Sequence, residues 1–340
     1  MPITESATKI KRPFVPKRNV SGILLLDKPE GISSSGALVK ARGIYRALKG
    51  GHTGSLDPLA SGLLPICLGE AAKFSSYFLE GNKKYIATGL LGKTTTTCDR
   101  EGEIVAERPI GNAFSRLNDT LQQFTGKITQ VPPIYSAVKV DGKPLYKYAR
   151  QGKDVEIPKR EIEIYSIKLL ATTEDSFTVE VYCSKGTYIR TLIADIGEAL
   201  GCGAFVTMLR RTYVEGLPEN NMISLEGLQN LADGRENPAD FTELDKLLYP
   251  LELAVNNLPL ISLPYNQAEP LTHGVRQKIN LKNTVLPEKT DGPLQVRCKG
   301  IFIGVCELKD SILIPLRMMA PECLDSLRLK NEKLNLNCTN

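Results

Sequence analysis

The sequence predicts an α+β protein with a large mixed domain followed by a small β-rich domain. Strand-like apolar runs and helical patterns interleave up to about residue 250. Four prolines, Pro250, Pro259, Pro264 and Pro270, then mark a connector, and beyond it the pattern changes to short strands alone. With 340 residues, of which 42% are apolar, the chain is long enough for two domains with a sizeable core.

The first sixty residues predict an arm, a strand and a helix. Residues 1–19 hold five Lys or Arg and no acid after Glu5, which indicates a flexible basic arm; a solvated tail without function has the same pattern. The apolar run Val20 to Leu26 predicts a strand that ends at a turn. Ser33 to Ser35 offer N-caps to a helix that we expect to run to about Leu48.

Strands and helices then alternate. We expect strands at 85–92, 162–170 and 177–183, where β-branched and apolar residues lie between turn signals. Apolar residues at helical spacing predict helices at about 117–124 and 189–200. These elements complete a mixed domain over 20–250.

The C-terminal part predicts a small β domain over 255–320. Short strands are expected at 294–299, 300–308 and 311–316, with a turn at Lys309-Asp310. We expect the last segment, 321–340, which is rich in Asn, Lys and Glu, to be disordered.

Composition excludes several classes of protein. The net charge of +5 permits an anionic partner without requiring one. With two histidines and no closely spaced cysteines, we expect no metal centre, no cofactor built on one and no disulfides. The sequence carries no secretory signal and no apolar run long enough to cross a membrane, which predicts a soluble cytoplasmic protein.

Residues 87–94 nearly match a phosphate-binding loop and follow a predicted strand. That motif requires a helix beginning at Lys93-Thr94, whose N–H groups point at the phosphates. Four threonines and a turn follow instead. We therefore reject a nucleotide-binding protein.

The segment 50–65 carries the clearest signs of chemistry. Four glycines and two prolines shape its backbone, and His52 and Asp57 stand alone among small and apolar residues. On residue type alone, Asp57 is either a nucleophile or general base, or an aspartate that caps a turn before Pro58.

Five motifs, one of them within this segment, occur in order along the chain. They are GILLLDKPEG (22–31), GHTGSLDP (51–58), QVPPIYSAVK (130–139), GTYIR (186–190) and GAFVTMLRR (203–211). This series resembles the bacterial tRNA pseudouridine-55 synthases, the TruB family, over about residues 20–215. The C-terminal part resembles, more weakly, the small RNA-binding PUA domain of that family.

The resemblance implies the pseudouridine synthase fold, a mixed and largely antiparallel sheet flanked by helices and loops, followed by a PUA-like domain. It implies isomerisation of the uridine at position 55, in the T loop of tRNA, to pseudouridine, with the base flipped out. The T arm of tRNA is then the partner, and we expect a cytoplasmic monomer with no cofactor, no protein partner and no membrane. Two questions stay open at this point: whether the protein also acts as a tRNA-folding chaperone, and what role the basic arm has.

By the same resemblance, Asp57 is the nucleophile, with attack on the sugar C1′ or the uracil C6 left open. Tyr85 stacks on the target base and is a candidate for handling the C5 proton; an isolated tyrosine is more often a half-buried strand residue. Arg190 pairs with Asp57, which we expect to lower the pKa of that carboxyl. Without the motif Arg190 would be a surface residue at a helix start.

Four further residues are expected to bind the substrate. Tyr188 and Leu209 line the uracil pocket, although Leu209 alone would be taken for a core residue. His52 inserts where the uridine leaves the stack; a structural loop histidine is the alternative. Lys73 is an electrostatic contributor.

The segment 135–160 is a basic insertion with interleaved tyrosines, suited to phosphate contact and stacking. The resemblance implies that it clamps the T arm, whereas a bare charge run is usually solvated surface. The rival function is an RNA-binding protein without chemistry, and intact Asp57, Tyr85 and Arg190 argue against it.

Overall fold

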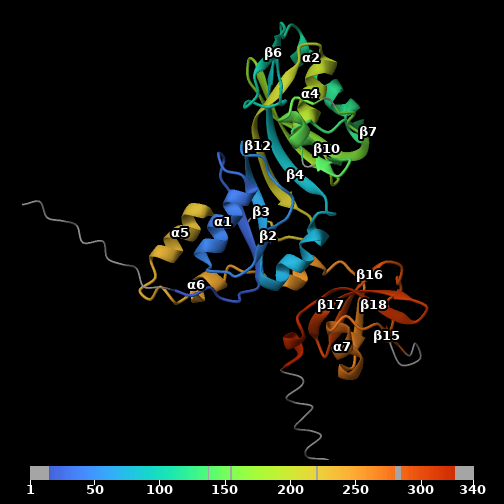
Figure 1. Cartoon of the computed structure of the whole chain (residues 1–340). Helices are drawn as coiled ribbons and strands as arrows, with labels where there is room; N and C mark the ends of the chain where they lie inside the picture. The colour runs from blue at the N-terminus through green and yellow to red at the C-terminus, as the bar shows by residue number, and fades with distance from the viewer. Residues whose placement is uncertain (1–14, 137, 154, 220, 280–284, 326–340) are drawn as a thin grey trace, which may run out of the picture.

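The structure, a computed structural model, describes residues 15–136, 138–153, 155–219, 221–279 and 285–325, and two β-sheets organise it (Figure 1). Within these residues the large sheet has nine strands. They are β1 (Gly22–Lys28), β2 (Gly50–His52), β3 (Ala60–Leu68), β4 (Lys83–Leu91), β7 (Gly126–Gln130), β10 (Arg160–Thr172), β11 (Ser176–Cys183), β12 (Ala204–Val214) and β13 (Ile223–Ser224).

The large sheet is mixed and largely antiparallel, as predicted. Its order is β13-β1-β3-β12-β4-β11-β10-β7, with β2 paired to β3. In the described part of the chain, β1 with β13 and β3 with β12 run parallel, and the other pairs run antiparallel. The expected strands at 85–92, 162–170 and 177–183 correspond to β4, β10 and β11.

Helices cover parts of this sheet. They are α1 (Ser34–Ile44), η1 (Gly69–Phe78), α2 (Ala113–Gln123), α4 (Ile189–Leu200), α5 (Leu225–Asp233), α6 (Thr242–Asp245) and η2 (Leu251–Ala254). Helix α4 packs on β12 and β4, and α2 packs on α4 and β10. At the other end of the sheet α1 and α5 pack together and lie against β3 and β1 (Figure 1).

Helix α1 begins as expected but ends earlier. The Ser33 side chain accepts from the N–H of Gly36, which caps the helix start. The helix ends at Ile44, before the predicted Leu48, because Arg46 takes a positive φ of 52°.

The N-terminal segment pairs with the chain after α1. Leu48 donates its N–H to the carbonyl of Arg18, 3.1 Å away, and the carbonyl of Arg46 accepts from the N–H of Arg18. Part of the segment assigned to the arm therefore lies against the end of α1, and residues 1–14 fall outside the described residues.

Short elements fill the connections. These are β5 (Lys93–Thr95), β6 (Ile104–Glu107), β8 (Lys139–Val140), β9 (Lys143–Pro144) and α3 (Leu145–Ala149). Because Lys93 and Thr94 lie in strand β5 rather than at a helix start, the rejection of a phosphate-binding loop is confirmed.

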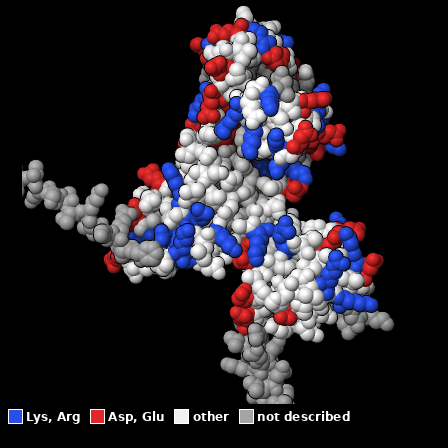
Figure 2. Space-filling view, in the orientation of Figure 1, with Lys and Arg blue, Asp and Glu red and all other residues white. Residues whose placement is uncertain are grey.

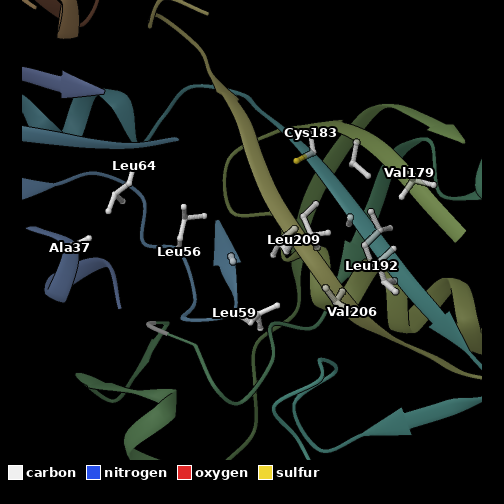
Figure 3. Close-up of a cluster of buried hydrophobic side chains, with 14 of the residues drawn as sticks. Ala37, Leu56, Leu59, Leu64, Val179, Cys183, Leu192, Val206 and Leu209 are labelled. Carbon is white, nitrogen blue, oxygen red and sulfur yellow. The ribbon is translucent and has the colours of Figure 1, made fainter. Parts of the chain in front are cut away.

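The core of the large sheet extends under the loop between β2 and β3. Figure 3 shows Leu56 and Leu59 of this loop with Val206 and Leu209 of β12 in one apolar cluster. Leu56 is 6% exposed and Leu59 1%. Burying two leucines within four residues ties an otherwise irregular segment to the sheet.

The C-terminal sheet has five strands among the described residues, in the order β14-β16-β17-β18-β15. They are β14 (Leu260–Leu263), β15 (Gln277–Lys278), β16 (Pro293–Cys298), β17 (Ile301–Lys309) and β18 (Ile312–Met318), with α7 (Tyr265–Thr272) and η3 (Pro321–Leu324) beside them. The predicted strands and their turn at Asp310 are confirmed, and the prediction of a small β-rich C-terminal unit is right. In the described residues no helix combines the length and apolarity needed to cross a membrane.

The two sheets share a hydrophobic core. Phe302 and Val305 of β17 are buried in one cluster with Ile23 of β1 and Phe74 of η1. The Phe74 and Phe302 rings meet edge to face at 5.2 Å between centroids. Packing therefore joins the C-terminal unit to the large sheet.

Candidate active site

A pocket of about 490 Å³ opens where the β2–β3 loop, β4, β12 and the start of α4 meet. Five of the seven predicted site residues line it: Asp57, Tyr85, Tyr188, Arg190 and Leu209. They come from positions far apart in the sequence, so the fold assembles this site. His52 and Lys73 lie outside the pocket lining.

Asp57 lies on a loop that is fixed on both sides. The buried side chains of Leu56 and Leu59 anchor its neighbours in the core. The hydroxyl of Ser34, at the start of α1, accepts from the N–H of Leu56 at 2.7 Å and donates to its carbonyl at 2.9 Å. The Asp57 side chain itself remains 41% exposed, so the carboxylate is held still while it faces the pocket.

Arg190, the second residue of α4, holds four segments together. Its Nε lies 2.9 Å from Oδ2 of Asp57, and its Nη1 lies 3.1 Å from Oδ2 of Asp99. The guanidinium also donates to the carbonyls of Thr97 at 3.2 Å and Tyr135 at 3.0 Å. The expected ion pair is therefore present; its Arg190 side chain is only 5% exposed, while the Asp57 side chain faces the pocket.

The net effect on the pKa of Asp57 is opposite to the expected direction. Burial raises the pKa of this carboxyl above its ordinary value, and the charge of Asp99 adds to the rise. Arg190 lowers the pKa, as predicted, and so does Lys28, but these two effects are smaller in total. The prediction considered the ion pair and left out the cost of taking the carboxylate out of water.

Asp99 is a site residue that the sequence analysis missed. It is 2% exposed, and its Oδ1 accepts from the hydroxyl of Thr97 at 2.5 Å and the N–H of Glu101 at 3.0 Å. A lone aspartate after four threonines reads as an ordinary turn residue. The sequence offered one indication: Asp99 lies among polar residues in the stretch after Thr94 where a turn was predicted.

Lys28, in the motif GILLLDKPEG, was also missed as a contributor to the site. It is fully buried, and its Nζ donates to the carbonyls of Pro29 and Ile32, at 2.8 Å each, and more weakly to Pro58 at 3.4 Å. Lys28 therefore ties the turn after β1 to the residue that follows Asp57. Burial lowers the pKa of this lysine, whereas the Asp57 charge raises it.

Arg211 lines the pocket beside Tyr85. It is 2% exposed, and it donates to the carbonyl of Leu63 at 2.7 Å and to that of Gly54 at 2.8 Å. Burial raises the pKa of the Tyr85 phenol, so it is protonated at neutral pH, while the charge and hydrogen bond of Arg211 oppose that rise. Nothing in the sequence distinguished Arg211 from its neighbour Arg210, which pairs with Asp27 at the sheet surface.

Tyr188 immediately precedes α4. Its ring lines the pocket, and its backbone bonds to the side chain of Gln130 at the end of β7. Leu209 of β12 is 5% exposed and belongs to the core cluster while it contributes to the pocket wall. The two interpretations considered for Leu209, core residue and pocket wall, are thus both compatible with its position.

His52 ends strand β2, five residues before Asp57. It is half-buried, and its Nδ1 makes no hydrogen bond within the described residues. Burial lowers the pKa of this imidazole, and the charge of Arg211 lowers it further. His52 is therefore a neutral planar ring at neutral pH.

Lys73 lies where η1 meets the C-terminal unit. Its Nζ pairs with Glu70 at 2.7 Å and donates to the carbonyl of Met318 at 3.3 Å. Glu70 also accepts from the N–H of Ala320 at 2.9 Å. The position of Lys73 indicates a contact between the two units, and its expected electrostatic role stays a prediction.

The basic insertion is a small hairpin and a short helix, β8, β9 and α3. Lys139, Lys143 and Lys147 are exposed on it. Figure 2 shows Lys and Arg side chains, interspersed with Asp and Glu, around β7 and β10 and on the C-terminal unit. Among the residues that the structure covers, no group of three or more His, Cys, Asp or Glu is placed to hold a metal ion.

This arrangement suits covalent chemistry on a planar substrate. A fixed carboxylate at a pocket can act as a nucleophile toward a bound substrate. The aromatic and aliphatic side chains around it offer flat, water-excluding walls, and the surrounding cations oppose loss of the charge on Asp57.

Comparison with known proteins places the chain in a family. Residues 42–189 match the TruB family pseudouridylate synthase N-terminal domain, and 190–256 match the tRNA pseudouridylate synthase B C-terminal domain. The chain is 44% identical to tRNA pseudouridine synthase B of Actinobacillus pleuropneumoniae over 312 residues, covering 91% of this chain and 99% of that one. It is 48% identical over 259 residues to the same-named protein of Shewanella amazonensis, covering 76% and 82% of the two chains.

Solved structures support the fold. The archaeal box H/ACA sRNP Nop10-Cbf5 complex contains a chain that superposes with a TM-score of 0.65 at 23% identity, covering 89% of this chain and 87% of that chain. At that identity the likeness concerns the fold. The matches to the two family models and to the curated relatives over most of its length show that the chain belongs to the TruB family of pseudouridylate synthases.

Proposed function

We propose that this protein isomerises the uridine at position 55, in the T loop of tRNA, to pseudouridine. The observation that carries the proposal is the pair of Asp57 and Arg190, 2.9 Å apart, at a pocket large enough for a nucleoside. Family membership and the name of the relatives, tRNA pseudouridine synthase B, support a tRNA substrate. The choice of position 55 rests on the motif series in the sequence.

The reaction is an isomerisation, so it needs a nucleophile, but no group is gained or lost by the nucleotide overall. If Asp57 attacks the sugar C1′, the bond from C1′ to N1 breaks and the uracil leaves as an anion. The base turns, C5 bonds to C1′, the carboxylate leaves, and the C5 proton is lost while N1 gains one. Attack on C6 leads to the same product. In both routes Asp57 reacts as the carboxylate, which the cations Arg190 and Lys28 favour.

Tyr85 is the candidate for the proton at C5. Its phenol is protonated at rest, so it accepts a proton only if it first gives its own away. Arg211 stabilises the phenolate and so makes that loss easier. Tyr85, Tyr188 and Leu209 form walls for the flipped base.

Binding is proposed to involve surfaces outside the pocket. His52, a neutral ring at the end of β2, is suited to fill the gap that the flipped uridine leaves. The lysines of the insertion and the Lys and Arg of the C-terminal unit are suited to contact the phosphates of folded RNA. We infer that the enzyme acts on tRNA in the cytoplasm.

The test is to incubate the protein with unmodified tRNA, without ATP or added metal, and to map pseudouridine at base resolution. We expect one modified position, in the T loop, with the wild type. Asp57→Asn removes the nucleophile and nearly preserves shape, so it should bind tRNA within about twofold of wild type and form no product. Product formation by Asp57→Asn at the wild-type rate would contradict the proposal. Binding without product by the wild type would favour an RNA-binding protein without chemistry.

A further inference from the structure

Two residues at the base of the basic insertion both contact Tyr188. Gln130 ends β7 and Arg160 begins β10, and the two are direct partners in the antiparallel ladder. The chain leaves the sheet after Gln130, forms the insertion and returns at Arg160. Because directly opposed residues of an antiparallel pair project on one face, both side chains point toward the start of α4.

The side chain of Gln130 makes two hydrogen bonds with the backbone of Tyr188, and we call this pair of bonds the two-point grip. Its Oε1 accepts from the N–H of Tyr188 at 2.8 Å, and its Nε2 donates to the carbonyl of Tyr188 at 3.0 Å. The residue is 1% exposed. A buried amide is costly unless it is bonded, and here each end of the amide is bonded to the same residue.

This grip compensates for a weak helix start. Tyr188 is the N-cap residue of α4, with extended φ and ψ of −100° and 107°, and its side chain makes no capping hydrogen bond. Tyrosine is a poor N-cap, so the position of the first turn depends on other contacts. Gln130 supplies such a contact from the end of strand β7. Arg190 lies in the first turn of α4, which this contact fixes.

Arg160 contacts the other part of Tyr188. Its guanidinium carbon lies 5.9 Å from the centroid of the Tyr188 ring, at the outer limit of a cation–π contact. One cross-strand pair thus contacts the backbone and the ring of a pocket residue. The same pocket is joined to the insertion again where Arg190 donates to the carbonyl of Tyr135.

We propose that Gln130 and Arg160 are positioning residues that set Tyr188 and the first turn of α4 at the pocket, and so couple the base of the insertion to catalysis. The inference rests on the proposed isomerisation at Asp57. It adds that the residues that close the insertion set the rate of the chemical step rather than the affinity for tRNA.

The first test separates rate from binding. Gln130→Met keeps the length of the side chain and removes both hydrogen bonds. We expect its single-turnover rate of pseudouridine formation to fall about 10- to 100-fold, because small displacements of reacting groups are costly, with the Kd for tRNA within about twofold of wild type. Gln122→Met, at an exposed glutamine of α2, is the matched control and should match wild type in both. A Gln130→Met enzyme that turns over within twofold of wild type would overturn the proposal.

The second test uses a conservative variant. In Gln130→Glu the neutral acid can still donate to the Tyr188 carbonyl and accept from its N–H, whereas the carboxylate cannot donate. Burial raises the pKa of such an acid and the facing Arg160 opposes the rise. The rate relative to wild type should therefore increase as the pH is lowered from about 8.5 to about 5.5, while the Gln130→Met ratio stays flat. A ratio for Gln130→Glu that decreases as the pH is lowered, so that the neutral acid works less well than the carboxylate, would overturn the two-point grip.

The third test addresses the ring contact by its effect on the rate, and the backbone contact by a measurement that does not depend on activity. Arg160→Met should lower the single-turnover rate about two- to fivefold, and Arg160→Lys, which keeps the cation, should recover most of it. Exchange of the Tyr188 amide hydrogen should be faster in Gln130→Met than in wild type. Unchanged exchange would refute the grip even in a protein that makes no pseudouridine, whereas a wild type without product would refute the proposed function alone.

Discussion

Arg190 carries one positive charge between two carboxylates, and this imbalance sets the chemistry of Asp57. Asp99 is the more buried acid, and its charge raises the pKa of Asp57. A nucleophile must be ionised, so a raised pKa shortens the pH range in which Asp57 works.

The pH dependence of the single-turnover rate tests this arrangement. In the proposed reaction Asp57 acts as the carboxylate, and burial raises its pKa, so the rate should fall with decreasing pH, with a midpoint above the ordinary value of about 3.9. Asp99→Asn removes a negative charge that raises the pKa, so the midpoint should move to lower pH.

The single-turnover rate of Asp99→Asn at the plateau above this midpoint, where Asp57 is ionised, reports a second effect. Arg190 loses an ionic partner, and we expect a plateau about tenfold lower, since charge-assisted hydrogen bonds to a buried group are worth about 1.5–3 kcal/mol. Glu103→Gln, an exposed acid on the same segment, is the control. A midpoint that moves to higher pH in Asp99→Asn would contradict the assigned direction.

At the scale of elements, the insertion has a charged tip and a buried base. Lys139, Lys143 and Lys147 are exposed on the hairpin and the short helix. Replacing all three with Ala should weaken tRNA binding and reduce the slope of log Kd against log salt by up to about 0.9 for each phosphate that the protein no longer neutralises. Lys246→Ala, at an exposed lysine that directly follows α6, is the control. An unchanged salt slope would show that these lysines do not contact RNA.

The elements also show what sequence could predict. Strong strand and helix patterns located β4, β11 and α4 within two residues, because long-range packing agrees with local preference there. The end of α1 was missed, since it depends on the left-handed turn at Arg46 rather than on hydrophobic spacing.

The predictions for the site follow the same rule. Asp57 and Arg190 were located because they lie in distinctive motifs, Tyr85 was located by the family resemblance outside those motifs, and the structure brings the three together. Asp99 and Arg211 were not found, because Asp99 lies in no motif and nothing in the sequence sets Arg211 apart from Arg210; only the fold shows that each is buried.

At the scale of the whole molecule, the shared core makes the two sheets one cooperative structure. Phe302 is 3% exposed and belongs to the cluster that contains residues of β1 and η1. Deleting residues 255–340 would therefore uncover apolar surface of the large sheet, so a truncated protein would report on stability as well as on RNA binding.

Phe302→Ala tests this cooperativity. We expect a loss of about 3–5 kcal/mol in the free energy of unfolding, measured by chemical denaturation, since a large buried ring is removed. The signals of both sheets should change in a single transition. Val285→Ala, at a side chain that is 89% exposed, should change stability by no more than about 0.5 kcal/mol. Two separate transitions, with only the C-terminal one displaced, would contradict a shared core.

The packing of Phe74 against Phe302 also has a geometric consequence. A flexible tether would let the C-terminal unit adapt to RNAs of different size, whereas a packed joint holds it at one distance from Asp57. An RNA that contacts both must then match that distance, and inserting or removing base pairs between the two contact points breaks the match. The packed joint would therefore select RNA substrates by the distance between their two contact points as well as by the nucleotide in the pocket.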